Sequence, residues 1–479
     1  MTWRPSFYPA FNLTDQKRMI NRILGREHRH PHQKIKPVLF VIAFFLLLPV
    51  FFQLSNGIFT DASFYFSSGG ILSILPIPFS IIMCGIGIVY LGELTKARLT
   101  ITILLLTCLS VLLTTVLLGM DFKSIENSKL ILLAQYILPM CALVLGQQYG
   151  SRPGAITIMA KAFTLILLFT VPAQLMTTWA HGMNILSPSL FLFSAYQHLQ
   201  YIPVIFAGAF LVAIFTLWEF PTYRLLLSAL AGLMGAYISL SHSILAIGLL
   251  TFGLVCFSGR TILLRKNRLH ASVTTMLAVF ILIVSASSND SKLSKEKLGV
   301  DTPSTAQMNE SDTTDTIDNA VLQIPLDTHL EIPNIVNKPE EEVLQTPRNL
   351  TERATYLKFY INEIFQTPNS ILLGHHEPPD RNVYPSAHNY YLDFIYNFGV
   401  LAIVPLLGLA TFTIYSVIRN FPRVFSSSKI VGIVGVVLFL VFVDNMFKVG
   451  MRQPYPGIMT FYLWGVLLAL LLKLKKRRL

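Results

Sequence analysis

Charged residues are scarce in this chain of 479 residues. Asp, Glu, Lys and Arg make up 13% of the sequence, whereas hydrophobic residues make up 53%. Because soluble domains carry about 25% charged residues, this composition excludes an ordinary soluble protein. Apolar runs long enough to cross a hydrocarbon core of about 30 Å recur from Pro37 to Leu472, which also excludes a soluble body on a single anchor.

Cysteine is scarce as well, with four residues in the whole chain. All of them lie inside apolar runs, and none lies in the long hydrophilic stretch where a disulfide would be useful: Cys84, Cys108, Cys141 and Cys256. The sequence therefore predicts cysteines that pack in the protein rather than a disulfide framework.

Conventional metal motifs and a secretory signal are missing too. The histidines of HRHPH (residues 28–32) lie in a basic segment, where attraction to anionic lipid is the simpler explanation. The triplet HHE (375–377) is followed by two prolines, which prevent the helix that a zinc motif needs. We therefore predict no metal and no cofactor. Residues 1–36 lack the order of a signal peptide and are expected to form a basic cytoplasmic tail.

The apolar runs divide the chain into spans and loops. We expect an all-α polytopic membrane protein with about twelve transmembrane helices, nine within residues 37–287 and three within 388–479, and one large external loop before the last three. The expected spans are residues 37–53, 71–92, 99–118, 130–148, 162–178, 202–218, 225–240, 243–258, 273–287, 390–418, 430–444 and 458–472.

The chain has a formal net charge of +12, and its basic residues are distributed unequally between the two sides of the membrane. If the N-terminus is cytoplasmic, most arginines and lysines near the spans lie inside, and the short outside loops hold only Lys123, Lys129, Lys448 and Arg452. This positive-inside bias predicts that both termini are cytoplasmic and that residues 288–387 are external. Membrane lipids, and no nucleic acid, are the partners that this distribution indicates.

The external stretch has two parts. Residues 288–347 are rich in small polar and acidic residues, which favours a flexible connection. From Thr351, a candidate N-cap, to residue 387 we expect ordered helical structure. Apolar residues recur there at helical spacing: Leu357, Tyr360, Ile361, Ile364 and Phe365. Arg353 projects from this apolar stripe, either to snorkel towards lipid phosphates or to serve a site.

The residues after this helix follow a recognisable order. Thr367-Pro368 precedes an apolar run that ends at Gly374, and then come HHEPPDRNVYPSA, His388-Asn389 and a span with Gly399 about ten residues on. This order, together with the large loop before the last spans, resembles the O-antigen ligase and polymerase family of bacterial cell-envelope glycan assembly. The resemblance covers residues 350–410.

The resemblance implies glycan transfer at the outer face of the bacterial cytoplasmic membrane. The family moves a glycan from undecaprenyl pyrophosphate to a lipid A-core sugar (ligases) or to another lipid-linked repeat unit (polymerases). Arg353 and His388 match the family's loop arginine and its His-Asn histidine. An arginine stabilises the departing pyrophosphate, and a neutral histidine takes the proton of the acceptor hydroxyl.

Other residues join this predicted site with less support. Asn389 is expected to cap the next helix or to orient His388. Gly374 and Arg381 are further candidates for substrate binding, although an exposed loop arginine is common. The stretch SLSHS (239–243) corresponds to a Ser-x-Ser-Arg-Gly-like turn of the family, with His242 in place of the arginine beside Ser241. For Ser241 and Ser243, a simple polar turn between two spans is the better explanation.

Two other functional classes remain open at this point. The chain is either an enzyme of the kind described, or a transporter or flippase of lipid-linked sugars, or a non-catalytic partner in envelope assembly. Transporters generally carry related halves and charges within the membrane, whereas these spans hold few ionisable groups and no internal repeat. The sequence does not decide between ligase and polymerase, and it does not name the sugar.

Overall fold

The computed structural model describes residues 79–119, 127–180, 201–264, 269–283, 346–380, 383–384 and 386–476. The predicted span at 37–53, the N-terminal tail, nearly all of the predicted flexible stretch 288–347, and Arg381 lie outside these residues. Within them, all regular structure is helical and no strand occurs.

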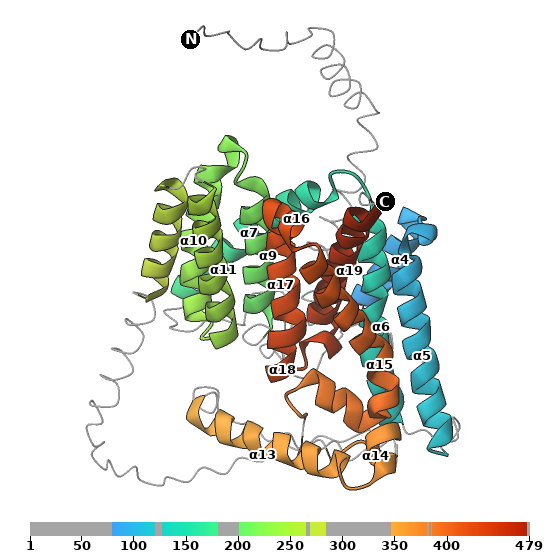
Figure 1. Cartoon of the computed structure of the whole chain (residues 1–479). Coiled ribbons are helices and arrows are strands. Elements are labelled where there is room, and N and C mark those ends of the chain that lie inside the picture. The colour runs from blue at the N-terminus through green and yellow to red at the C-terminus, as the bar shows by residue number, and fades with distance from the viewer. Residues whose placement is uncertain are drawn as a thin grey trace, which may run out of the picture.

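Most of the helices stand side by side in a bundle, and α13 and α14 lie below it (Figure 1). The first part contains α4 (Phe79–Leu91), η3 (Leu94–Ala97), α5 (Arg98–Leu117), α6 (Asn127–Gly150), α7 (Ala155–Ala180), α9 (Ile202–Leu217), α10 (Pro221–Leu240), α11 (Ile244–Leu263) and a helix at Leu269–Ile283. The second part contains α13 (Thr346–Ile364), α14 (Pro368–Leu373), α15 (Tyr390–Arg419), α16 (Phe421–Ser426), α17 (Ser428–Leu438), a π-helical turn (Phe439–Asp444), α18 (Asn445–Phe447), η6 (Gly450–Arg452) and α19 (Pro454–Lys476).

Seven helices in the described part are long and apolar enough to cross a membrane. They are Leu94–Leu117, Ala155–Met176, Pro221–Leu240, Ile244–Leu263, Tyr390–Arg419, Ser428–Phe447 and Tyr455–Lys475. Two shorter apolar helices, Ile202–Leu217 and Leu269–Ile283, accompany them. The prediction of an all-α membrane protein is therefore confirmed, whereas the number of twelve spans stays a prediction.

Helices α6 and α19 pack closely against each other. A Cβ added to Gly146 would lie 2.0 Å from the carbonyl oxygen of Tyr462, and one added to Gly465 would lie 2.3 Å from that of Leu143. Glycines at both positions let the two backbones approach each other, which is how membrane helices gain contact without a hydrophobic driving force. This pair holds the start of α19, and with it η6, in a fixed place.

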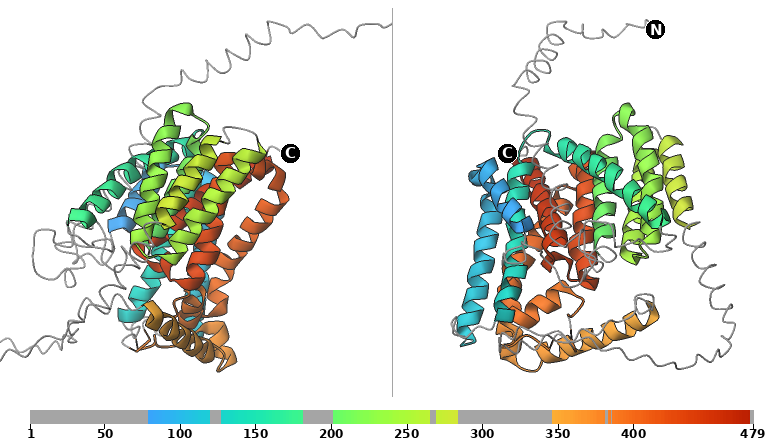
Figure 2. Two further views of the ribbon diagram at one scale, coloured as in Figure 1. Left: turned by 90° about the vertical axis from the view of Figure 1, so that its left-hand side faces the viewer. Right: turned by 180° about the vertical axis from the view of Figure 1, so that it is seen from behind.

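The two ends of the bundle are formed by different elements. Helix α16 and the C-terminal end of α19 lie at one end, and α13 and α14 lie at the other (Figures 1 and 2). Basic side chains bind backbone carbonyls at the α16 end: Arg260 donates to Phe425 and Ser426, and Lys473 donates to Gly150. Segments that the sequence assigns to the cytoplasm thus share one end of the bundle.

Helix α15 is kinked at Gly399, where φ is 78° and ψ is 168°. The kink frees the carbonyl of Tyr396 from the helix, and the backbone N–H of His375 donates to it over 2.8 Å. Gly374, with φ of 85°, packs against the kink, because a Cβ there would lie 2.7 Å from the amide nitrogen of Gly399. The two glycines therefore fasten the end of α14 to the bend of α15.

Two local predictions about the external region need correction. Helix α13 begins at Thr346, so Thr351 lies inside it and is not its N-cap. The chain is helical to Ile364 and again over α14, but between Gly374 and Asn389 the described residues are irregular rather than helical. Pro378 and Pro379 lack backbone N–H donors, which prevents a helix in this segment. The long irregular segment carries His388 towards the start of α15.

Candidate functional site

A cluster of ionisable side chains lies at the α13 end of the bundle. It is formed by α13, by the segment from Ser386 to the first turn of α15, and by the connection from α18 through η6 to α19. The members that carry the site are Arg353, His388, Asp393, Asp444, Lys448 and Arg452, and each of them is buried or half-buried. We call these six residues the ionic cluster.

His388 is held in an uncommon conformation beside α13. Its φ is 47°, in the left-handed region, and its backbone N–H donates to the Ser386 hydroxyl over 3.3 Å. Its ring stacks on that of Tyr356, with centroids 5.9 Å apart and planes at 21°. Burial, and then the positive charge of Arg353, lower the pKa of His388 to about 4. The imidazole is therefore neutral at pH 7 and able to accept a proton.

Arg353 reaches the cluster because α13 is anchored by aromatic residues. Tyr360 is buried, its ring packs edge-on against Tyr396 at 5.0 Å, and its hydroxyl donates to the carbonyl of Tyr384 over 3.3 Å. Residues 353, 356 and 360 share one helix face, so the same face that buries Tyr360 turns Arg353 towards His388. The charge of Arg353 acts on both His388 and Lys448, which favours a site residue over an arginine that snorkels to lipid.

Asn389 has the capping role that its position predicts. Its side-chain oxygen accepts from the N–H groups of Tyr391 at 3.0 Å and Leu392 at 3.1 Å. These bonds fix the start of α15 and thereby the backbone of the preceding His388. The amide of Asn389 is thus engaged by the protein itself.

Asp393 is the buried centre of a network that sequence reasoning missed. It lies in the first turn of α15, is 1% exposed, and accepts from the hydroxyl of Tyr136 on α6 and from the guanidinium of Arg452 on η6. The guanidinium also lies 5.9 Å from the ring centroid of Tyr136. A carboxylate and a guanidinium that are both buried require such pairing, and together they tie α15, α6 and η6 into one unit.

A second buried ion pair follows the π-helical turn. The ammonium of Lys448 lies 3.7 Å from Oδ1 of Asp444 and 5.7 Å from the ring centroid of Tyr201. Asn445 shapes this connection, because it donates to Leu440 over 2.7 Å and accepts from the N–H of Met451 over 2.8 Å. Turns of this type are frequent at functional sites.

Some predicted residues lie apart from the cluster. His242 is exposed at the turn between α10 and α11, and the described residues show no hydrogen bond or ion pair between it and the cluster. Ser241 is buried, and its hydroxyl donates to Ile238 over 2.7 Å, which makes it part of the turn. Gly374 serves the packing of α14 on α15, as its contact with Gly399 requires.

The two predicted histidines nevertheless share one backbone property. Among the described non-glycine residues, a positive φ occurs at His242 (51°) and His388 (47°) alone. Such conformations cost about 1–2 kcal/mol and concentrate at functional sites. For His388, whose surroundings are also ionic, this strain adds to the evidence for a functional role.

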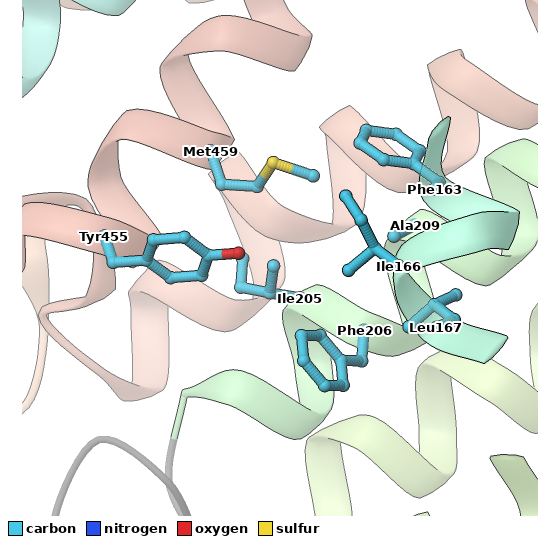
Figure 3. A pocket seen from close by; sticks show the side chains of 8 residues that line it. All are labelled: Phe163, Ile166, Leu167, Ile205, Phe206, Ala209, Tyr455 and Met459. Atoms are coloured by element: carbon cyan, nitrogen blue, oxygen red, sulfur yellow. The ribbon is translucent and has the colours of Figure 1, made fainter. Parts of the chain in front are cut away.

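A small apolar pocket lies elsewhere in the bundle, between α7, α9 and α19 (Figure 3). Its lining is Phe163, Ile166, Leu167, Ile205, Phe206, Ala209, Tyr455 and Met459, and the Tyr455 hydroxyl points into it. None of these side chains is an acid, a base or a nucleophile suited to chemistry near neutral pH. The ionic cluster is therefore the better candidate for the functional site.

The four residues of the ionic cluster that were not predicted are nevertheless unusual in the sequence. Lys448 and Arg452 are two of the rare basic residues in short external loops, and Asp393 and Asp444 are rare acids in apolar runs. An ionisable residue within or beside a span marks a functional site by default. Their pairing, however, joins segments far apart in the chain.

Comparisons with known proteins add no assignment. No family model, no curated protein and no solved structure matches this chain. The chemistry of the ionic cluster and the motif order in residues 350–410 are therefore the features that indicate a function.

Proposed function

We propose that this chain is a membrane glycosyltransferase that moves a glycan from undecaprenyl pyrophosphate to an acceptor hydroxyl, as the resemblance to the O-antigen ligase and polymerase family implies. One observation carries the proposal. Arg353 and His388, which the motif order marks as a pair, come from separate elements that meet where the His388 ring stacks on Tyr356, one turn along α13 from Arg353. The charge of Arg353 helps to keep His388 neutral. A fixed cation beside a neutral base suits transfer from a diphosphate carrier, because the cation stabilises the departing charge and the base accepts the acceptor's proton.

The reaction assigns one role to each of these side chains. The acceptor oxygen bonds to the anomeric carbon, the bond between that carbon and the phosphate oxygen breaks, and the electron pair leaves with the diphosphate. Arg353 stabilises the departing charge through paired N–H donors. His388 takes the proton of the acceptor hydroxyl. Asp393 and Arg452 act as positioning residues, because their ion pair holds the first turn of α15 in place.

Donor binding also tunes the histidine. With a pKa of about 4, His388 is neutral but only weakly basic in the free protein. The diphosphate brings negative charge close to Arg353 and offsets its field, which raises the pKa of His388 towards its ordinary value. His388 thus becomes a stronger base when the donor is present, and proton transfer is coupled to donor binding.

The placement in the membrane is part of the proposal. We place about twelve spans in the cytoplasmic membrane of a bacterium, both termini inside, and the ionic cluster at the outer face. The basic side chains at the α16 end, such as Arg260 and Lys473, support this orientation. Labelling of a Ser304→Cys variant, in a background without other cysteines, tests it. The thiol should react with an impermeant reagent in intact spheroplasts, and protection there would contradict the orientation.

The acceptor separates a ligase from a polymerase. In a strain that lacks the gene, loss of all polymer from lipid A-core with accumulation of lipid-linked chains indicates a ligase, whereas single repeats on the core indicate a polymerase. Accumulation of lipid-linked units on the cytoplasmic side would instead indicate a flippase and contradict the proposal. Unchanged polymer after point mutation of Arg353, with the whole protein still required, would indicate a non-catalytic assembly partner.

A further inference from the structure

A group of aromatic rings from α13 and the irregular segment after α14 lies beside His388. Tyr356 stacks on the His388 ring, with centroids 5.9 Å apart. Tyr384 packs edge-on against Tyr356 at 6.2 Å, and it stacks on Phe359 at 3.7 Å with planes at 4°. The three residues Tyr356, Phe359 and Tyr384 are half-buried, and we call them the aromatic platform. The platform is therefore continuous with the ring of His388.

We infer that the aromatic platform binds the acceptor sugar, and that the hydroxyls of Tyr356 and Tyr384 bond to hydroxyls of that sugar. This inference rests on the proposed function, in which His388 takes the proton of the acceptor hydroxyl. Proton transfer requires that this hydroxyl lie within hydrogen-bond reach of the imidazole or one water away. The sugar that carries it must therefore rest on the residues beside His388, and Tyr356 contacts His388 directly.

The stack on Tyr356 leaves the edge of the His388 ring for the acceptor. Stacking covers a face of the imidazole, whereas the lone pair that accepts a proton points outward in the ring plane. The hydrogen bond between His388 and Ser386 is made by the backbone N–H of His388, and within the described residues no hydrogen bond engages its ring. A sugar hydroxyl can thus approach a ring nitrogen while the rest of the sugar lies against Tyr356.

Tyrosine hydroxyls at this end of the bundle serve different purposes. Those of Tyr360 and Tyr391 donate to backbone carbonyls over 3.3 and 2.7 Å, and so they hold α13 and α15 in place. Tyr356 and Tyr384 pack through their rings, and in the part of the chain that the structure describes neither hydroxyl makes a hydrogen bond. These two hydroxyls are therefore suited to a ligand rather than to the fold.

A sugar matches the platform chemically. Its C–H groups pack on the negative face of an aromatic ring, and its hydroxyls both donate and accept hydrogen bonds, as a tyrosine hydroxyl does. Lipid headgroups are the other surface that aromatic residues at a membrane boundary contact. The sugar is favoured here because Tyr356 turns its ring onto His388, and Phe359 and Tyr384 cover each other, whereas a belt residue turns its ring towards lipid.

Acceptor kinetics of purified protein in liposomes test the inference. The undecaprenyl-pyrophosphate-linked glycan is kept at saturation, and lipid A-core and a lipid-linked repeat unit are each varied as the acceptor. Tyr356→Phe and Tyr384→Phe remove a hydroxyl and keep the ring. Each should raise the KM of the acceptor about fivefold, with kcat and the KM of the donor unchanged, because only binding energy is lost. Both variants should unfold at the wild-type temperature.

A third variant separates the ring from the hydroxyl. Tyr356→Leu loses the stack on His388 as well, so kcat should fall at least about tenfold in addition to the rise in acceptor KM. Tyr415→Phe is the control for the substitution. Tyr415 lies near the far end of α15, where its hydroxyl accepts from Arg419 over 2.9 Å, so all kinetic constants should match the wild type.

The outcomes separate the two claims. An unchanged acceptor KM in both Tyr→Phe variants overturns the role of the platform and leaves the proposed function standing. A rise confined to the KM of the donor overturns the assignment to the acceptor sugar. Lower unfolding temperatures with a lower kcat and an unchanged acceptor KM would show that the two hydroxyls serve the fold. If the wild type transfers glycan to neither acceptor, the proposed function fails, and the inference that rests on it fails too.

Discussion

Asp393 on α15 and Arg452 on η6 form a buried ion pair at the centre of the cluster. The two side chains are 1% and 8% exposed. Removal of one partner leaves the other charge buried without compensation, at a cost of about 3–5 kcal/mol. We expect Asp393→Leu to lower the unfolding temperature sharply in detergent.

The double variant Asp393→Leu with Arg452→Met is the companion measurement. Because it buries no unpaired charge, it should be more stable than either single variant. Its transfer activity should stay low, since the first turn of α15 is no longer held against α6 and η6. Additive losses of stability would show that the two residues do not act as a pair.

The left-handed backbone of His388 predicts a separation of stability from activity. Glycine adopts φ of 47° without strain, whereas alanine does not, so His388→Gly should be more stable than His388→Ala by about 1 kcal/mol. Both variants should lose transfer activity. The neighbouring Ala387→Gly is the control, because φ is not positive there, and it should lose stability instead. Thermal unfolding of the three variants checks this order.

The lowered pKa of His388 predicts the direction of a pH effect. Since its pKa is about 4 when folded and about 6.5 when unfolded, the unfolded chain binds more protons between these values. This residue's contribution to stability is therefore full above about pH 6.5 and is lost as the pH falls towards 4. Between pH 7 and pH 5, the unfolding temperature of the wild-type protein should fall further than that of His388→Gln. Equal losses would mean that His388 is not buried beside Arg353.

The pH dependence of the kinetics should reveal the pKa of His388 both in the free enzyme and in the complex with the donor. The acid limb of kcat/KM reports the free enzyme and should lie near pH 4, whereas that of kcat should lie higher, because the bound diphosphate raises the pKa of His388. Coincident limbs would show that the donor does not approach this histidine.

The glycine contact between α14 and α15 gives a purely structural prediction. In Gly399→Ala the new Cβ would lie 2.2 Å from the carbonyl oxygen of Leu372, and alanine would have to adopt a positive φ. The variant should therefore destabilise the protein by more than about 1 kcal/mol. Gly408→Ala in the same helix meets nothing within 4 Å and should be neutral or slightly stabilising. Similar unfolding temperatures for the two variants would contradict the packing of Gly374 against the kink.

Local patterns in the sequence predicted part of this architecture. Apolar run length predicted the membrane helices, and the spacing of Tyr360 and Ile364 predicted the buried face of α13, because both signals depend on neighbours in sequence. The position of Asn389 predicted its cap for the same reason. The predicted start of α13 was wrong. A threonine followed by an acidic residue is typical of an N-cap, but the same pair also occurs inside helices, as Thr351 does here.

The contacts within the ionic cluster could not be predicted from local sequence patterns. Asp393 meets Arg452 and Tyr136 across long sequence separations, and Tyr356 meets His388 because α13 lies beneath the bundle (Figure 1). No periodicity encodes such pairings, which arise from helix packing at Gly146 and Gly465 and from the kink at Gly399. A rare acid in an apolar run marks such a residue but does not name its partner.

Transfer by purified protein in liposomes measures the roles of Arg353 and His388 in the reaction itself. With an undecaprenyl-pyrophosphate-linked glycan and an acceptor, His388→Ala should lose at least about a hundredfold in rate. Arg353→Lys should also lose much of the activity, because an ammonium cannot reproduce paired contacts to phosphate. Lys358→Met, which changes an exposed side chain of α13, should match the wild type, and all variants should insert into the membrane normally. A wild-type rate from His388→Ala would contradict the assignment of this histidine as the base.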